Sequence, residues 1–214
     1  MIFVKLFDPE SPLMSALGTL CDLVFCNVLF CLLSLPLFTV GASAAALYDC
    51  TLAIVEQREG SSIVARFWNA FRRNFRRATA LWFVLLGCVL FLWAYARAVD
   101  ALSGDLQRLY RVTFFVLLFV FLAGGQYVFP LQARTRGASI PYTLKTAWLL
   151  SAAALPCTLC ALGIGVAAVY LSFFLNPAAL NTAVFLWAFG VVAVVAYLQS
   201  FLYVRAFRIL DRMP

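Results

Sequence analysis

The sequence contains no histidine, and only 9 of its 214 residues are acidic. Charged residues make up 12% of the chain, whereas a soluble domain carries about 25%. A chain folded in water needs such charges at its surface, so their scarcity excludes an ordinary soluble domain. Without histidine and with scattered acids, no catalytic triad, paired-carboxylate site or metal cluster is visible. We therefore expect no enzymatic activity, no metal and no cofactor.

Charged residues are entirely missing from four long stretches. These are residues 23–48, 78–96, 112–133 and 146–204. Crossing the hydrocarbon core of a bilayer takes about 20 apolar residues as a helix. Each stretch is long enough to cross, and the last is long enough to cross twice around the polar turn from Asn176 to Asn181. The pattern predicts an all-α fold, a polytopic helical membrane protein with a single domain over residues 1–214.

Six transmembrane helices are expected in this domain. Their predicted ranges are 12–35, 42–57, 78–96, 112–133, 146–175 and 178–204. The second is only ~24 Å long as a helix, but its small residues favour a tight hairpin with the first helix. If it is instead a re-entrant or surface segment, five helices cross and the amino terminus lies on the other side.

Residues 62–77 have the pattern of an amphipathic helix. At 100° per residue, the aromatic side chains of Phe67, Phe71 and Phe75 share one face, opposite an arginine face. The arginine face consists of Arg66, Arg72, Arg73, Arg76 and Arg77. Such a helix lies in the membrane interface with its arginines toward anionic lipid headgroups. This face either fixes the topology alone or docks a partner.

The distribution of basic residues predicts the orientation. Arginine and lysine are concentrated in 56–77, in 134–145 and in the tail from Arg205, which alternate with the weakly charged 97–111 and 176–181. The positive-inside rule makes the three basic stretches cytoplasmic, together with the carboxyl terminus. Because the basic residues flank apolar runs, the net charge of +7 does not indicate a nucleic-acid partner.

Polar side chains inside the spans are the candidate intramembrane site. Asp22, Asn27 and Asp49 lie within the first two predicted helices, where an ionisable group is costly and suggests function. Folding the chain at Phe38 places Asp49 level with Asn27, so a hydrogen bond between them is expected. The site is a structural clamp, a substrate or proton site, or an acid near the membrane surface. Two further polar residues, Gln126 and Gln199, are expected to form interhelical hydrogen bonds.

A short sequence similarity between two parts of the chain indicates an internal repeat. Residues 60–63, Gly-Ser-Ser-Ile, recur as Gly-Ala-Ser-Ile at 137–140, in each case before basic residues and a predicted span. Parallel repeats of this kind occur in transporters. The seven cysteines lie in apolar stretches and are interpreted as small buried hydrophobes, including the pair Cys157 and Cys160.

Two motifs resemble those of a known family. The first runs through Leu35–Ser43, Ala46–Tyr48 and Phe71–Thr79, and the second through Phe129–Arg134 and Leu144–Ala147. They resemble the YesL-like family of bacterial membrane proteins, a domain of unknown function. Asp49 departs from the family pattern, in which an aromatic or apolar residue is expected.

The resemblance implies a multi-pass protein of the bacterial cytoplasmic membrane, encoded beside carbohydrate ABC-transporter genes. It therefore implies an accessory role in carbohydrate uptake, with the bilayer and its anionic lipids and ABC-transporter subunits as partners. The alternative is a small transporter or channel that acts alone. No catalytic or binding residue is implied by the resemblance.

Overall fold

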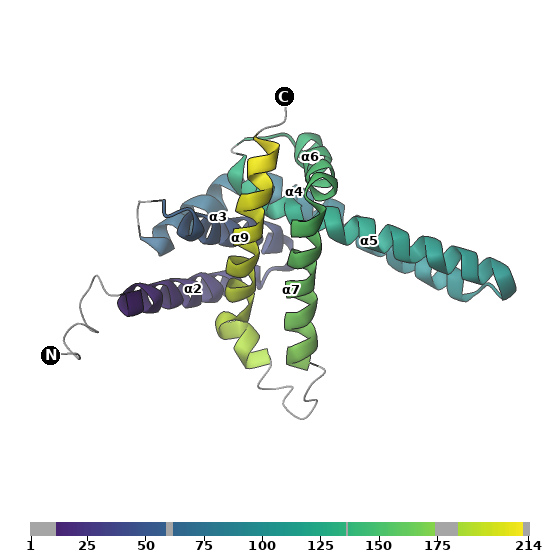
Figure 1. Cartoon of the computed structure of the whole chain (residues 1–214), viewed down its shortest axis with the longest axis horizontal. Coiled ribbons are helices and arrows are strands. Elements are labelled where there is room, and N and C mark those ends of the chain that lie inside the picture. Colours follow the sequence, from purple (N-terminus) through teal and green to yellow (C-terminus); the bar gives the residue numbers. More distant parts are fainter. Residues whose placement is uncertain (1–11, 59–61, 136, 174–183, 212–214) are drawn as a thin grey trace.

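The computed structural model describes residues 12–58, 62–135, 137–173 and 184–211, and this part of the chain is all helical (Figure 1). In chain order the elements are α2 (Pro12–Ser34), the 3-10 turn η1 (Leu37–Thr39), α3 (Val40–Val55), α4 (Ile63–Asp100), α5 (Gly104–Arg134), α6 (Ile140–Ala153), α7 (Leu155–Phe173), the π-helical turn η3 (Trp187–Val191) and α9 (Val192–Leu210).

Six of the described helices are long and apolar enough to cross a membrane. They are Met14–Ser34, Leu37–Val55, Ile63–Asp100, Gly104–Arg134, Leu155–Phe173 and Val184–Leu210. The predicted all-α polytopic fold is confirmed by these helices, and the chain is a multi-pass membrane protein by their length and hydropathy. Because Leu37–Val55 meets the same criteria, the six-span alternative is favoured over five. The predicted turn at 176–181 lies outside the described residues.

The first hairpin turns through Pro36 and the 3-10 turn η1, which contains Phe38, the predicted folding point. The Thr39 hydroxyl donates to the carbonyl oxygens of Leu33 and Pro36, and the hydroxyls of Ser34 and Ser43 lie 2.6 Å apart. These bonds satisfy polar groups between the two helices that have no hydrogen-bond partner within a helix. The chain therefore returns directly from α2 into α3.

The central helix of the molecule is α3, which packs against α2, α4, α5 and α9. Small side chains allow this close approach, and 67% of its most apolar window is buried within the protein. A Cβ atom on Gly41 would lie 2.4 Å from the Ala78 carbonyl oxygen and 2.6 Å from Trp82 Cβ. Only glycine fits at this crossing of α3 and α4.

The predicted amphipathic segment and the span after it form one helix. Residues 62–77 were expected to lie flat in the interface, but α4 continues through Arg77 and Ala78 without a break. Its 38 residues extend over ~57 Å, nearly twice the hydrocarbon thickness of ~30 Å. The charged turns before Ala78 are therefore the part of α4 that extends beyond the hydrocarbon.

The range 146–175 was expected to be one span, but the structure divides it between two helices. Here α6 ends at Ala153, Ala154 leaves helical geometry with φ −114° and ψ 40°, and α7 begins at Leu155. The physical reason is Pro156, which has no N–H and whose ring clashes with the carbonyl four residues earlier. The spanning helix is shortened to Leu155–Phe173.

The helices diverge from a shared core. Figure 1 shows α7 beside α9, with α2 extending to one side of this pair and the α4–α5 hairpin to the other. One apolar cluster includes Tyr127, Leu131 and Tyr203, and a second joins the alanines of α3 to Phe67 of α4. The first cluster joins the end of α5 to the carboxyl-terminal part of α9, and the second joins α2, α3 and α4.

Candidate functional site

Asn27 is fully buried on α2 and bonds to the π-helical turn η3. Its Nδ2 donates to the carbonyl oxygens of Trp187 at 3.0 Å and Ala188 at 2.7 Å, and its Oδ1 accepts from the Ala193 N–H at 2.9 Å. Ala188 and Ala193 are five residues apart, the spacing of a π-helical bond. The Asn27 amide therefore bonds main-chain groups of the last helix at the point where the regular α-helical hydrogen bonds are interrupted.

Asp49 has a different partner from the one predicted. Its Oδ1 lies 3.1 Å from the Arg73 Nη2, and Asp49 itself is 7% exposed. Arg73 belongs to the charged, amino-terminal part of α4, so Asp49 lies toward the basic end of the molecule. The predicted Asp49–Asn27 hydrogen bond is wrong, because each residue is bonded to a different helix.

Asp22 lies at the same basic end. It lines a cavity of about 450 Å³ with Gln57, Arg58 and Arg66. Asp22 lies near the middle of the Met14–Ser34 span, but it shares this cavity with Arg58 and Arg66 rather than with Asn27 or Asp49. The structure therefore does not bring Asp22, Asn27 and Asp49 together into one intramembrane site.

The glutamines of the spans connect helices, as expected. The Tyr48 hydroxyl donates to Gln199 Oε1 at 2.8 Å, and Gln199 Nε2 donates to the Ala161 carbonyl at 3.0 Å. Gln126 Nε2 donates to the Thr158 carbonyl at 3.1 Å. These bonds join α3, α5, α7 and α9, and the prediction of interhelical hydrogen bonds at Gln126 and Gln199 is confirmed.

The arginine face of α4 faces outward, while the aromatic face packs on protein. Phe67 and Phe71 are buried against α3 rather than in lipid. The exposed side carries Arg72, Arg73, Arg76 and Arg77, with Arg66 partly buried. Arg72 lies 5.5 Å from the centroid of the Trp68 ring, a cation–π contact. Phe67 and Phe71 therefore do not require a membrane surface to cover them, whereas Trp68 remains exposed.

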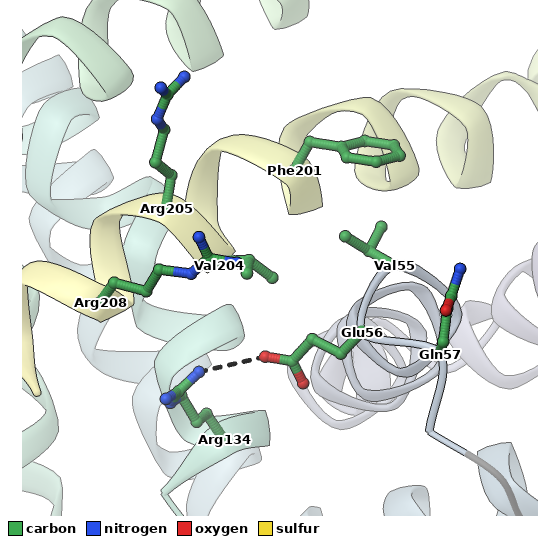
Figure 2. Close-up of a pocket in the computed structure, with 8 residues that line it drawn as sticks. All are labelled: Val55, Glu56, Gln57, Arg134, Phe201, Val204, Arg205 and Arg208. Atoms are coloured by element: carbon green, nitrogen blue, oxygen red, sulfur yellow. Dashed lines mark hydrogen bonds and ion pairs between the residues drawn. The ribbon is translucent and has the colours of Figure 1, made fainter.

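The carboxyl-terminal ends of α3, α5 and α9 enclose a basic pocket of about 590 Å³ (Figure 2). Its lining consists of Val55, Glu56, Gln57, Arg134, Phe201, Val204, Arg205 and Arg208. Arg134 donates to Glu56 Oε1 at 3.2 Å and to Asp211 Oδ2 at 2.6 Å, and its guanidinium lies 5.0 Å from the centroid of the Phe207 ring. Arg134 is thus held in place by α3 and α9.

Gln57 borders this pocket in an unusual backbone conformation. Its φ is +50°, in the left-handed region that favours glycine. The Gln57 N–H bonds the Ile54 carbonyl at 3.2 Å and the Arg58 N–H bonds the Ala53 carbonyl at 3.0 Å, which is the Schellman pattern at the end of α3. Glutamine therefore occupies the position where glycine is usual.

Four pocket residues were not predicted as a site: Glu56, Arg134, Arg205 and Arg208. The one local signal is that Arg205 and Arg208 are three residues apart and share a helix face. Local spacing does not reveal that the end of α5 meets the end of α9. Only the tertiary structure brings Arg134 to them.

Within the described ranges, no group of three or more histidine, cysteine or acidic side chains is placed to hold a metal ion. The seven cysteines are free thiols, including Cys157 and Cys160.

Residues 23–95 match a family model described as "Protein of unknown function, DUF624". The match begins in α2 and covers η1, α3 and most of α4, so it includes the first hairpin and the arginine face. No curated protein and no solved structure is significantly similar to the chain. This segment is therefore similar to a family whose description carries no function, and the YesL-like assignment stays a prediction.

Proposed function

We propose that this chain is a non-enzymatic accessory protein of the bacterial cytoplasmic membrane that docks onto a carbohydrate-uptake complex. Docking uses the arginine face of α4, on the cytoplasmic side, and an acidic surface of an ABC-transporter subunit. The link to carbohydrate uptake rests on the family resemblance alone, and the cytoplasmic placement rests on the positive-inside rule.

The observation that carries the proposal is the outward position of the arginine face. Its helix is anchored by Phe67 and Phe71 on α3, so the arginines stand on a rigid support. Of the four exposed arginines, Arg73 has an acidic partner in Asp49. Charges on a fixed surface give specificity and speed to association with a complementary surface.

The polar interior supports the accessory role over a transporter or channel that acts alone. Asp22 and Asp49 lie toward the basic end, and Asn27 is committed to the backbone of the last helix. Gln126 and Gln199 are likewise engaged by main-chain carbonyls. Apart from Asp22, these residues are bonded to other helices, which favours a role in helix packing over proton or cation coupling.

Co-purification from native membranes tests the proposal. The variant Arg72→Gln/Arg76→Gln/Arg77→Gln keeps the Arg73–Asp49 pair, and we expect it to lose the transporter subunits that the wild type retains. The matched control is Arg97→Gln/Arg108→Gln/Arg111→Gln, which removes the same charge near the α4–α5 turn and should retain them. Equal recovery with both variants would contradict docking by this face. Solute movement by the purified wild type in liposomes would support the transporter alternative instead.

A further inference from the structure

We propose that the pocket between the ends of α3, α5 and α9 binds the phosphate headgroup of an anionic phospholipid. This site is separate from the arginine face of α4, and it does not depend on the docking role. Its volume of about 590 Å³ lies within the ~300–1,000 Å³ range of small-molecule sites.

The charge balance of the pocket favours a bound anion. Arg134 is already engaged by Glu56 and Asp211, and Glu56 is also paired with Arg58. Both nearby carboxylates are therefore neutralised by arginine. Arg205 and Arg208 line the same pocket, and neither has an ion-pair partner among the described residues. A guanidinium group matches the oxygens of a phosphate, so Arg208 can bind the phosphate directly and the charge of Arg205 can attract it.

The directions of the side chains agree with this assignment. Figure 2 shows Arg208 extending from α9 on the side of the Arg134–Glu56 pair, whereas the Arg205 side chain points away from that pair. A phosphate between Arg208 and Arg134 would meet donors from two different helices. Arg205 would add attraction at the entrance rather than a central contact.

The apolar wall argues for a lipid rather than a free anion. Val204 and Arg205 each lie three or four residues from both Phe201 and Arg208, the spacing that places side chains on one face of a helix. Along ~10 Å of α9, this face changes from apolar to basic. Phe201 is 50% exposed, so its ring is available to an acyl chain.

The position of the pocket along the chain supports the same conclusion. Arg205 ends the charge-free stretch of residues 146–204, so it lies where hydrocarbon gives way to headgroups. Val55 and Glu56 make the same transition at the end of α3. An anionic phospholipid matches this order, because its acyl carbons and its phosphate lie on opposite sides of that boundary.

Thermal unfolding of the purified full-length protein in detergent tests the site. Short-chain phosphatidylglycerol is titrated against short-chain phosphatidylcholine and inorganic phosphate. We expect phosphatidylglycerol to raise the Tm and phosphatidylcholine to have little effect. Arg205→Gln and Arg208→Gln should each weaken phosphatidylglycerol binding about fivefold. Arg134 is left intact because its ion pairs join three helices.

Two further variants keep the outcome clear. Lys145→Gln/Arg97→Gln removes two exposed charges outside the pocket and should bind phosphatidylglycerol as the wild type does. Phe201→Ser should weaken phosphatidylglycerol binding without changing the response to phosphate. Equal stabilisation by phosphatidylcholine, or unchanged binding in Arg205→Gln/Arg208→Gln, would overturn the proposal. If inorganic phosphate raises the Tm as much as phosphatidylglycerol and Phe201→Ser has no effect, the ligand is a free anion and the lipid assignment is wrong.

Discussion

The Asn27 side chain bridges the open backbone of the last spanning helix, accepting from the Ala193 N–H at 2.9 Å. The same amide donates to the Ala188 carbonyl at 2.7 Å. A residue in the first span thereby controls the helical geometry of the last, more than 160 positions away. The π-helical turn is a consequence of tertiary structure as well as of local sequence.

Replacing Asn27 by leucine should destabilise the protein by about 1–2 kcal/mol, since buried main-chain groups of the last helix lose their partner. Hydrogen exchange of the Ala193 amide should also become faster. Thermal unfolding and exchange measured by mass spectrometry check this. Asn69→Leu, at an exposed position on α4, is the control, and a similar loss there would mean that Asn27 has no special role.

The Asp49–Arg73 pair should show coupling in a double-mutant cycle. We expect a coupling energy of about 0.5–1 kcal/mol for Asp49→Asn with Arg73→Gln, because the arginine side chain is 39% exposed and partly hydrated. The cycle of Asp49→Asn with Asn27→Leu should be additive, since those residues do not touch. Coupling in the second cycle and none in the first would contradict the described contacts.

Substitution at Gly41 should be much more harmful than at Gly87. Valine at Gly41 places Cβ within 2.6 Å of α4, and such overpacking costs about 1–3 kcal/mol. Valine at Gly87 meets nothing within 4 Å and should be nearly neutral. Unfolding temperatures of the two variants, measured in the same detergent, make the comparison. If Gly41→Val were as stable as Gly87→Val, the close crossing of α3 and α4 would be refuted.

The variant Gln57→Gly should be more stable than the wild type by about 0.5–1 kcal/mol, because glycine adopts positive φ without steric cost. Gln57→Ala keeps a Cβ atom and should give no such gain. Chemical denaturation in mixed micelles separates the two variants. Equal stabilisation by both would mean that the glutamine side chain, rather than its backbone, is unfavourable.

The predicted orientation places the α4–α5 turn outside and the carboxyl terminus inside. A reporter inserted at Ser103 should therefore be periplasmic, whereas one fused to the carboxyl terminus should be cytoplasmic. The accessibility of a cysteine introduced at residue 5 then separates six spans from five. An external carboxyl terminus would contradict the positive-inside assignment.

Sequence reasoning recovered the spans because their signal is local. Nineteen uncharged residues from Ala78 to Ala96 require a hydrophobic environment whatever their neighbours are. The break at Ala154 was missed although Pro156 was visible, because prolines are tolerated within many transmembrane helices. Residues 62–77 and the next span were predicted as two separate helices because the arginines mark the boundary of the apolar stretch. A charged boundary does not interrupt an α-helix, so the two segments form one helix.

The candidate site was less predictable than the fold. Asn27 and Asp49 are both buried, but they bond to the last helix and to α4 rather than to each other. Arg134 and Arg208 line one pocket because the carboxyl-terminal parts of α5 and α9 lie side by side. Such long-range contacts depend on how helices pack, which the periodicity of one segment does not contain.

The unbroken α4 has a mechanical consequence. A proline-free helix from Ile63 to Asp100 has no point at which it bends easily, so its two halves must tilt as one lever. A displacement of the α4–α5 turn parallel to the membrane plane would swing the arginines in the opposite direction, with the helix pivoting at its crossing with Gly41. The α6–α7 pair, broken at Ala154, cannot transmit motion in this way, so the two halves of the molecule differ in stiffness.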